Sequence, residues 1–251
     1  VQQVAQPEIQ VLDIIGADVL DVGRVFNTED SDWYDVTLSN GVAAQWPGWF
    51  RPRHNKGGSY EYFDCEGTLI AKMPNGGMCF DQQYFPDKED YPENYTDLDK
   101  EMGKVIWSAM VHSPWDHSNE KYFWETLRER CLVLKNSTDR ALMITCGCNF
   151  FEWGTFLRRM ENYLMDIYEE PEQVLALNDQ LLERHLKNLE NTCKYLDGIV
   201  DIVRFGDDLG MNNNMFMSLE KYRTLFKPYH TKINEYVHKH SSMKTFLHSC
   251  G

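Results

Sequence analysis

The sequence of 251 residues contains no apolar run that approaches the length needed to span a bilayer, and it carries little positive charge. Its 25 Lys and Arg are outnumbered by 39 Asp and Glu, so the formal net charge is -14, and no basic run stands out. A protein that binds DNA or RNA normally carries a basic stripe. These absences argue against a membrane and against nucleic acid as partners.

The cysteines form no recognisable disulfide framework. There are seven of them, an odd number, scattered along a long chain, which favours a reducing, cytoplasmic location. The start of the chain at Val1 lacks the basic region and the apolar stretch of a signal peptide, and it also lacks an initiator Met. We therefore expect a trimmed or partial chain in the cytoplasm.

Hydrophobic residues make up 42 % of the sequence, enough to build a core, and no low-complexity tract appears. Four apolar runs are typical of parallel strands, which are buried on both faces. The runs are residues 17–22 (ADVLDV), 141–146 (ALMITC), 198–205 (GIVDIVRF) and 243–247 (MKTFL). Each run is followed by polar or glycine residues.

Apolar residues at helical spacing separate these runs. They predict helices over residues 119–137 and 153–168, and a long helix that begins at Pro171. Ser218 is expected to cap a further helix that runs to about residue 240, and Pro228 to kink or split that helix. Strands that alternate with helices in this way form right-handed βαβ units and a parallel sheet.

Residues 33–85 differ from the rest because they are rich in Gly, Tyr, Trp and Phe. Segments 59–63 and 68–71 alternate as antiparallel strands do, and residues 74–77 (PNGG) predict a turn. We therefore predict a single α/β domain over residues 1–251 with an antiparallel hairpin insertion. About four βα units are visible where a complete (β/α)8 TIM barrel has eight. The chain holds either an incomplete barrel or a smaller open sheet.

Parallel α/β folds place their sites at the carboxyl ends of strands. His248 and Cys250 stand two residues apart at the end of the last run, so both point to one face of a strand. An imidazole and a thiolate suit zinc, which needs three or four ligands. The remaining ligands would come from Glu152, Asp207, Asp208 or absent sequence. The alternative is a hydrogen-bonded core histidine beside a small buried cysteine.

Charged residues follow the other three runs. Asp207 and Asp208 could bind a cation or a substrate, or act as acid and base, but they also suit a solvated loop or a helix cap. Glu152 stands among aromatic residues, where we expect a raised pKa or a bound cationic group, unless it only complements a helix dipole. Arg24 is a candidate for a substrate carboxylate or phosphate, or for a structural ion pair.

Four segments together resemble the uroporphyrinogen decarboxylase superfamily. They are residues 150–166 (FFEWGTFLRRMENYLMD), 201–210 (DIVRFGDDLG), 217–228 (MSLEKYRTLFKP) and 246–251 (FLHSCG). The set is most similar to the branch of corrinoid-dependent methyltransferases, and the resemblance covers roughly residues 10–251. It implies a TIM barrel that lacks its first strand and about its last three.

The resemblance also implies an activity, the transfer of a methyl group between a small methylated substrate and a cobalamin carried by a separate corrinoid protein. His248 and Cys250 match zinc ligands of that branch, whereas its further Cys ligand has no match here. Zinc would act as a Lewis acid, or activate a thiol or the leaving heteroatom. The expected catalytic groups are Asp207, Asp208 and Glu152, and the expected substrate-binding groups are Asn149, Phe151 and Arg24.

Two alternative functions stay open. Uroporphyrinogen decarboxylases proper use no metal, and they need an Asp at the end of the second strand and a Tyr after the third. The aligned positions, Gly23 or Arg24 and the loop around Glu152, lack both, which favours methyl transfer. The other alternative is a non-catalytic member that binds a ligand or a partner. A half-barrel leaves apolar edges uncovered, so we expect missing segments or another chain, as in a homo-oligomer, to cover them.

Overall fold

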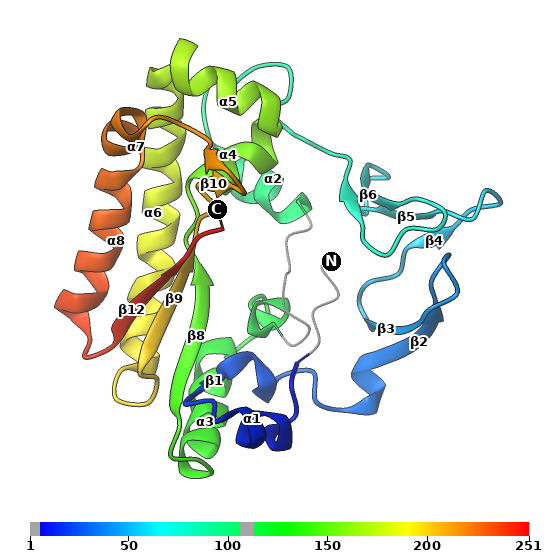
Figure 1. The fold of residues 1–251 in the computed structure, drawn as a ribbon, viewed down its shortest axis with the longest axis vertical. Helices are drawn as coiled ribbons and strands as arrows, with labels where there is room; N and C mark the ends of the chain where they lie inside the picture. The colour runs from blue at the N-terminus through cyan, green and yellow to red at the C-terminus, as the bar shows by residue number, and fades with distance from the viewer. Residues whose placement is uncertain (1–5, 106–112, 251) are drawn as a thin grey trace.

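The computed structural model describes residues 6–105 and 113–250. The residues before Gln6, which carry the expectation of a trimmed chain, and Gly251 lie outside this part. Helices and strands alternate around an insertion of antiparallel strands (Figure 1). Within the described ranges, no helix combines the length and the apolar character that crossing a membrane requires.

A parallel sheet of four strands forms the centre of the fold, as predicted. The strands lie side by side in chain order: β1 (Val19–Asp21), β8 (Ala141–Gly147), β9 (Ile202–Gly206) and β12 (Lys244–His248). Because all neighbours are parallel, the four carboxyl ends lie at one edge of the sheet. The residues after these strands are therefore brought together.

The third strand is shorter than the apolar run that predicts it. Gly198 has a φ of 77°, a left-handed conformation that glycine adopts without strain. The N–H groups of Ile199 and Val200 both donate to the carbonyl of Leu196 at 3.0 Å. The first part of the run therefore forms the turn that follows helix α6, and β9 begins only at Ile202.

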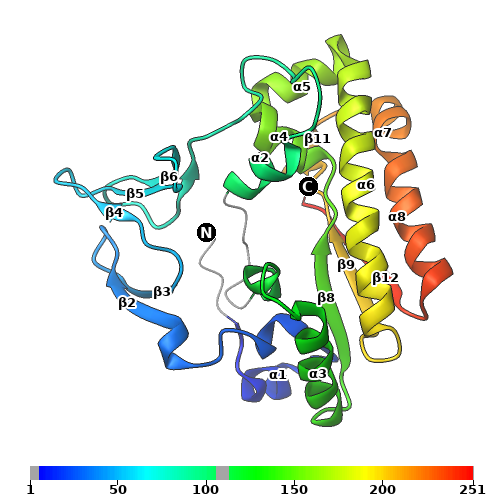
Figure 2. The same ribbon diagram turned by 180° about the vertical axis from the view of Figure 1, so that it is seen from behind.

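Three long helices pack in a row: α3 (Phe123–Asn136) against α6 (Pro171–Leu196), and α6 against α8 (Lys227–His240). Figures 1 and 2 show α6 and α8 side by side on one face of the sheet. Alternate strand residues, among them Ile144 and Val203, are fully buried in the core that these helices share. Their neighbours Thr145 and Arg204 are only partly buried on the opposite face.

The helix starts agree with the sequence in two places. Helix α6 begins at Pro171, and the hydroxyl of Ser218 accepts a hydrogen bond from the N–H of Lys221 at 3.2 Å at the start of α7 (Leu219–Leu225). Helix α8 then starts at Lys227, so the helix is split just before Pro228, as predicted. Proline suits the first turn of α8 because its missing N–H would have no partner there.

The helix predicted over residues 153–168 is in fact two helices, α4 (Phe151–Arg158) and α5 (Met160–Glu169). Arg159 between them has a φ of 70°, which interrupts the helical path. The break lets the two helices pack against each other, with Tyr163 fully buried. An arginine in this conformation gives no sequence signal of the kind that Gly or Pro would give.

An antiparallel insertion is present, as predicted for residues 33–85, and it contains two separate sheets. A separate aromatic core with Trp46 and Phe50 at its centre holds it together. The turn predicted at residues 74–77 is present, with the N–H of Gly77 donating to the carbonyl of Pro74 at 2.9 Å. The strands are β2 (Trp33–Thr37), β3 (Ala43–Pro47), β4 (Arg53–His54), β5 (Tyr60–Phe63), β6 (Leu69–Met73) and β7 (Asp81–Gln82).

Short elements complete the described chain. Two of them, β10 and β11, form a small hairpin that follows the end of β9. The short elements are α1 (Ile9–Ile15), the 3-10 turns η1 (Val22–Val25), η2 (Asp30–Asp32) and η3 (Pro114–His117), α2 (Leu98–Lys104), β10 (Gly210–Met211) and β11 (Asn214–Met215).

Candidate functional site

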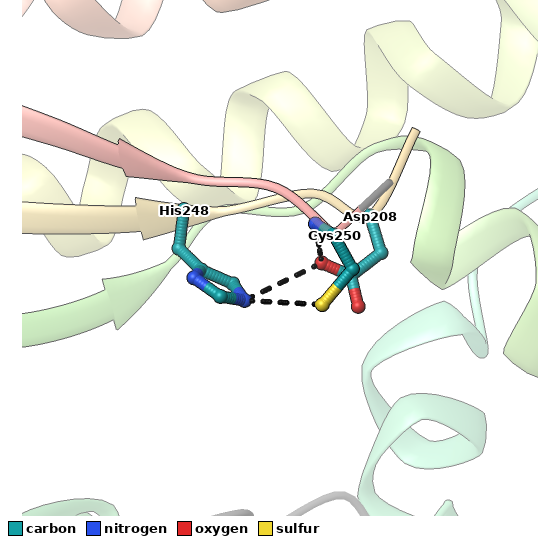
Figure 3. Close-up of side chains that lie close together, drawn as sticks. All are labelled: Asp208, His248 and Cys250. Atoms are coloured by element: carbon teal, nitrogen blue, oxygen red, sulfur yellow. Dashed lines mark hydrogen bonds and ion pairs between the residues drawn. The ribbon is translucent and has the colours of Figure 1, made fainter. Parts of the chain in front are cut away.

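The ends of β9 and β12 bring three potential metal ligands together. His248 is the last residue of β12 and pairs with Gly206 of β9, so Asp208 and Cys250 follow at the same edge. One ligand atom from each of Asp208, His248 and Cys250 lies within 4.8 Å of the others. Figure 3 shows the imidazole nitrogen of His248 facing both the Cys250 sulfur and an oxygen of Asp208. We call these three residues the DHC group.

Two of the three spacings within the DHC group are those of ligands around a tetrahedral zinc ion. Cys250 Sγ lies 3.4 Å from His248 Nε2, and His248 Nε2 lies 3.7 Å from Asp208 Oδ1. Tetrahedral zinc with bonds of about 2.0–2.3 Å separates its N, O and S ligands by about 3.3–3.7 Å. The sulfur, nitrogen and oxygen donors are also those that zinc selects.

The DHC group is negatively charged and open to solvent. The side chains of His248 and Asp208 are 44 % and 37 % exposed, and Cys250 is exposed. The hydrogen bond and the charge of Asp208 raise the pKa of the Cys250 thiol, and the charge of Glu152 adds to this. A cation in the group would reverse this effect, because it favours the thiolate.

Glu152 lies beside the DHC group, in the first turn of α4. Its Oε2 accepts a hydrogen bond from the backbone N–H of Asp208 at 3.2 Å and another from the side-chain amide of Asn149. Burial raises the pKa of Glu152 to about 7, and the nearby charges of Asp207 and Asp208 contribute to the rise. A carboxyl group with this pKa is suited to exchange a proton at neutral pH.

The raised pKa of Glu152 predicts a pH-dependent stability of the metal-free protein. The folded state keeps the proton up to about pH 7, whereas the unfolded chain releases it near the ordinary value of 4.5, so rising pH costs stability in this window. Glu152→Gln removes that cost. We expect this variant to gain stability over the wild type from about pH 4.5 to about pH 7 and to keep the gain above it.

Urea unfolding at about pH 5.5 and about pH 8 measures this difference. Glu172→Gln is the matched control, because Glu172 lies in the first turn of α6 but is exposed. An equal stability difference between wild type and Glu152→Gln at both pH values would contradict the prediction.

Asp207 differs from its neighbour Asp208 because no part of it is exposed. Its carboxylate accepts hydrogen bonds from the backbone N–H groups of Phe150, Phe151 and Glu152 at 3.0–3.1 Å. These contacts are those of a helix cap, one of the two alternatives for this residue, although the helix is α4 and not one that follows β9. Asp207 therefore holds the backbone that carries Glu152.

The three predicted substrate-binding residues are placed differently. Asn149 is 1 % exposed and bonds Glu152, so it lies within the site. Phe151 is also 1 % exposed and stacks on Phe216 in the core. Arg24 lies in η1 after β1, and β1 and β12 are the two outer strands of the four-stranded sheet. Arg24 donates to the carbonyl of Pro7 at 3.2 Å. The fold does not bring Arg24 to the DHC group.

Two buried polar groups near the strand ends have no clear sequence signal. Asp21 ends β1 with its carboxylate bonded to the N–H of Gly23 at 2.7 Å and to the hydroxyl of Thr145 at 3.2 Å, and burial raises its pKa. Asp21 lies inside the apolar run 17–22, and two strands separate β1 from β12, so the fold does not bring it to the DHC group. His230 reaches Asp207 from α8, a contact that only the packing of the helices creates.

Comparison of the chain with models of protein families, with curated proteins and with solved structures gave no match. The family expected from the sequence segments therefore stays a prediction. The geometry of the DHC group and of Glu152 is the basis for a functional assignment.

Proposed function

We propose that this protein is a zinc-assisted methyltransferase that moves a methyl group between a small methylated substrate and a corrinoid held by a partner protein. The observation that carries the proposal is the DHC group, with three donor atoms within 4.8 Å of one another at the ends of two adjacent parallel strands. Glu152 beside it supplies a proton-exchanging carboxyl group.

We further propose that the central sheet is part of a (β/α)8 barrel. Its four strands lie in chain order, all parallel, as consecutive barrel strands do. The DHC group follows the carboxyl ends of β9 and β12, where barrel enzymes place their sites. Phe246 on the edge strand β12 is 50 % exposed, which suits an edge that a further strand or chain covers.

The residues of the proposed site have separate roles. Asp208, His248 and Cys250 would hold the metal, which when bound would supply Lewis acidity or activate the thiol or heteroatom of the substrate. Glu152 in its protonated form would donate its proton to the heteroatom that loses the methyl group, since its pKa is about 7. Asn149 orients the Glu152 carboxylate through its amide.

The exposure of the DHC group supports a reaction with a group that a second protein carries. The His248 side chain is 44 % exposed, and Cys250 is exposed as well. A large cofactor held by a partner can only approach a site that is open in this way. We therefore propose a corrinoid protein as the partner.

The first test is zinc binding. We expect one zinc ion per chain, and an affinity that Cys250→Ser or His248→Ala lowers by more than about 100-fold, because loss of an outer-shell partner alone costs about 10- to 100-fold. Titration with a chromophoric chelator measures the affinity. Cys79→Ser is the control, since Cys79 is also an exposed free thiol but lies in the insertion.

The second test is activity, with free cob(I)alamin as methyl acceptor and methanol, methylamine or dimethyl sulfide as donor. Zinc-dependent methylation of the cobalamin that Glu152→Gln slows would support the proposal. A protein that binds no zinc and methylates nothing would refute it. Metal-independent release of CO2 from a porphyrinogen would instead support the decarboxylase alternative, for which Asp21 is the buried carboxyl group at a strand end.

A further inference from the structure

The carboxylate of Asp207 is the meeting point of several elements. Besides the three backbone N–H groups at the start of α4, it bonds His230 Nε2 of α8 at 2.9 Å. Asp207 is fully buried and His230 is 5 % exposed, so water does not replace these bonds. The hydroxyl of Tyr222 on α7 lies 3.4 Å from the other ring nitrogen of His230.

The backbone of Asp207 reaches a third element. Its N–H donates to the carbonyl of His248 at 3.0 Å, which continues the pairing of β9 with β12. Leu209, two residues on, donates its N–H to the hydroxyl of Ser249 at 3.1 Å. One residue therefore ties the end of β12 to the start of α4, and its side chain anchors both to α8.

Apart from α8, the segments that meet at Asp207 each carry a residue of the proposed site. Helix α4 carries Glu152, the end of β12 carries His248, and Asp208 is the next residue in the chain. The distance between Glu152 and the DHC group depends on how the first turn of α4 sits against the end of β9. Asp207 follows β9 and its carboxylate bonds the first turn of α4, so it links these two segments. His230 bonds the same carboxylate from α8.

We propose that His230 is a positioning residue for the site. Its hydrogen bond to Asp207 holds the first turn of α4 in place against the ends of β9 and β12. It thereby sets the relative positions of Asp208, His248 and Glu152. This inference rests on the proposed function as far as the metal is concerned. Helix α8 lies on the far side of the sheet, and through His230 it helps to set the geometry of the DHC group.

A purely structural role predicts something different. In that case His230 would only add to the stability of the core, and any loss of core packing on α8 would have the same effect. Val237 provides the comparison, since it is a fully buried residue of α8 that is part of the core and has no hydrogen bond to Asp207 through its side chain. His230→Phe and Val237→Ala therefore separate the two roles.

The experiment compares His230→Phe, His230→Gln and Val237→Ala at a temperature where each is folded by circular dichroism. Cobalt(II) alone is the spectroscopic probe, and zinc affinity is measured by chelator competition. We expect His230→Phe to change the visible cobalt spectrum and lower zinc affinity by roughly 10- to 100-fold, the usual cost of losing an outer-shell partner. His230→Gln should restore much of both, because its amide N–H can replace the Nε2 donor.

Amide hydrogen exchange of residues 150–152 in the metal-free protein gives an independent readout. Faster exchange there in His230→Phe, but not in Val237→Ala, supports the inference even if the wild type binds no metal and the proposed function fails. A wild type that binds cobalt, with His230→Phe and Val237→Ala alike in spectrum and affinity, overturns the inference and leaves the proposed function standing. Without metal binding, equal exchange in the two variants overturns it as well.

Discussion

Asp166→Asn is expected to lower the free energy of unfolding by about 3–5 kcal/mol, because it leaves a buried guanidinium without its counter-charge. The side chains of Arg158 and Asp166 are only 10 % and 8 % exposed, and their closest atoms, Nε and Oδ2, are 2.8 Å apart. Arg158 also donates to the carbonyl of Asp87 at 2.7 Å, and Tyr91 donates its hydroxyl to Asp166 at 2.9 Å. The pair therefore joins α4, α5 and the connector before α2.

Glu161→Gln is the matched control for this prediction. Glu161 lies on the same helix and pairs with Arg159 at 2.6 Å, but the two side chains are 55 % and 48 % exposed. Exposed pairs contribute at most about 1 kcal/mol, so this variant should differ little from the wild type. Urea unfolding of both variants tests the contrast. Equal losses of stability would mean that the buried pair contributes no more than a surface pair.

Gly154→Ala is expected to cost about 3 kcal/mol or more, at or above the upper end of the range for overpacked cores. A Cβ atom on Gly154 would lie 2.0 Å from Cζ of Tyr163 and 2.2 Å from its Cε1, far inside contact distance. Tyr163 is fully buried between α4, α5 and Phe226, so its ring has no free space to enter. The two helices would have to separate to accept the methyl group.

Gly103→Ala is the control, because a Cβ atom at this helical position meets nothing within 4 Å. Alanine is the better helix former, so this variant should gain about 0.5–1 kcal/mol. Thermal unfolding measures both variants. On a Tyr163→Leu background, which removes the ring, the additional cost of Gly154→Ala should fall sharply. An unchanged cost on that background would show that the methyl group destabilises the helix for a reason other than a clash with the Tyr163 ring.

The elements around the central sheet could be predicted because their signals are local. The apolar run at residues 141–146 forms a strand whose alternate residues are buried in the core, whereas Pro171 starts a helix through its fixed backbone and Ser218 through its side-chain hydroxyl. The two-residue spacing of His248 and Cys250 likewise places both on one side of a strand end. These patterns depend on neighbours in sequence alone.

The division between α4 and α5 could not be predicted in this way. In one continuous helix, Arg158 and Asp166 would be about 12 Å apart along the axis, and Gly154 and Tyr163 about 13.5 Å. Their contacts exist only because Arg159 adopts a positive φ, which the surrounding packing supports. A sequence that keeps its helical spacing across the break carries no sign of it.

The sequence by itself determined the alternation of strands and helices, the antiparallel insertion and the strand-end position of His248 and Cys250. Tertiary structure alone decided that Asp208 joins them while Asp207 turns into the core. It also decided that Glu152 is partly buried beside both aspartates, where burial first and their charges second raise its pKa to about 7. The physical reason is the separation along the chain over which each kind of interaction acts. Strand and helix propensities act between residues a few positions apart, whereas the site forms from segments about 55 and 100 residues apart that only the register of parallel strands brings together.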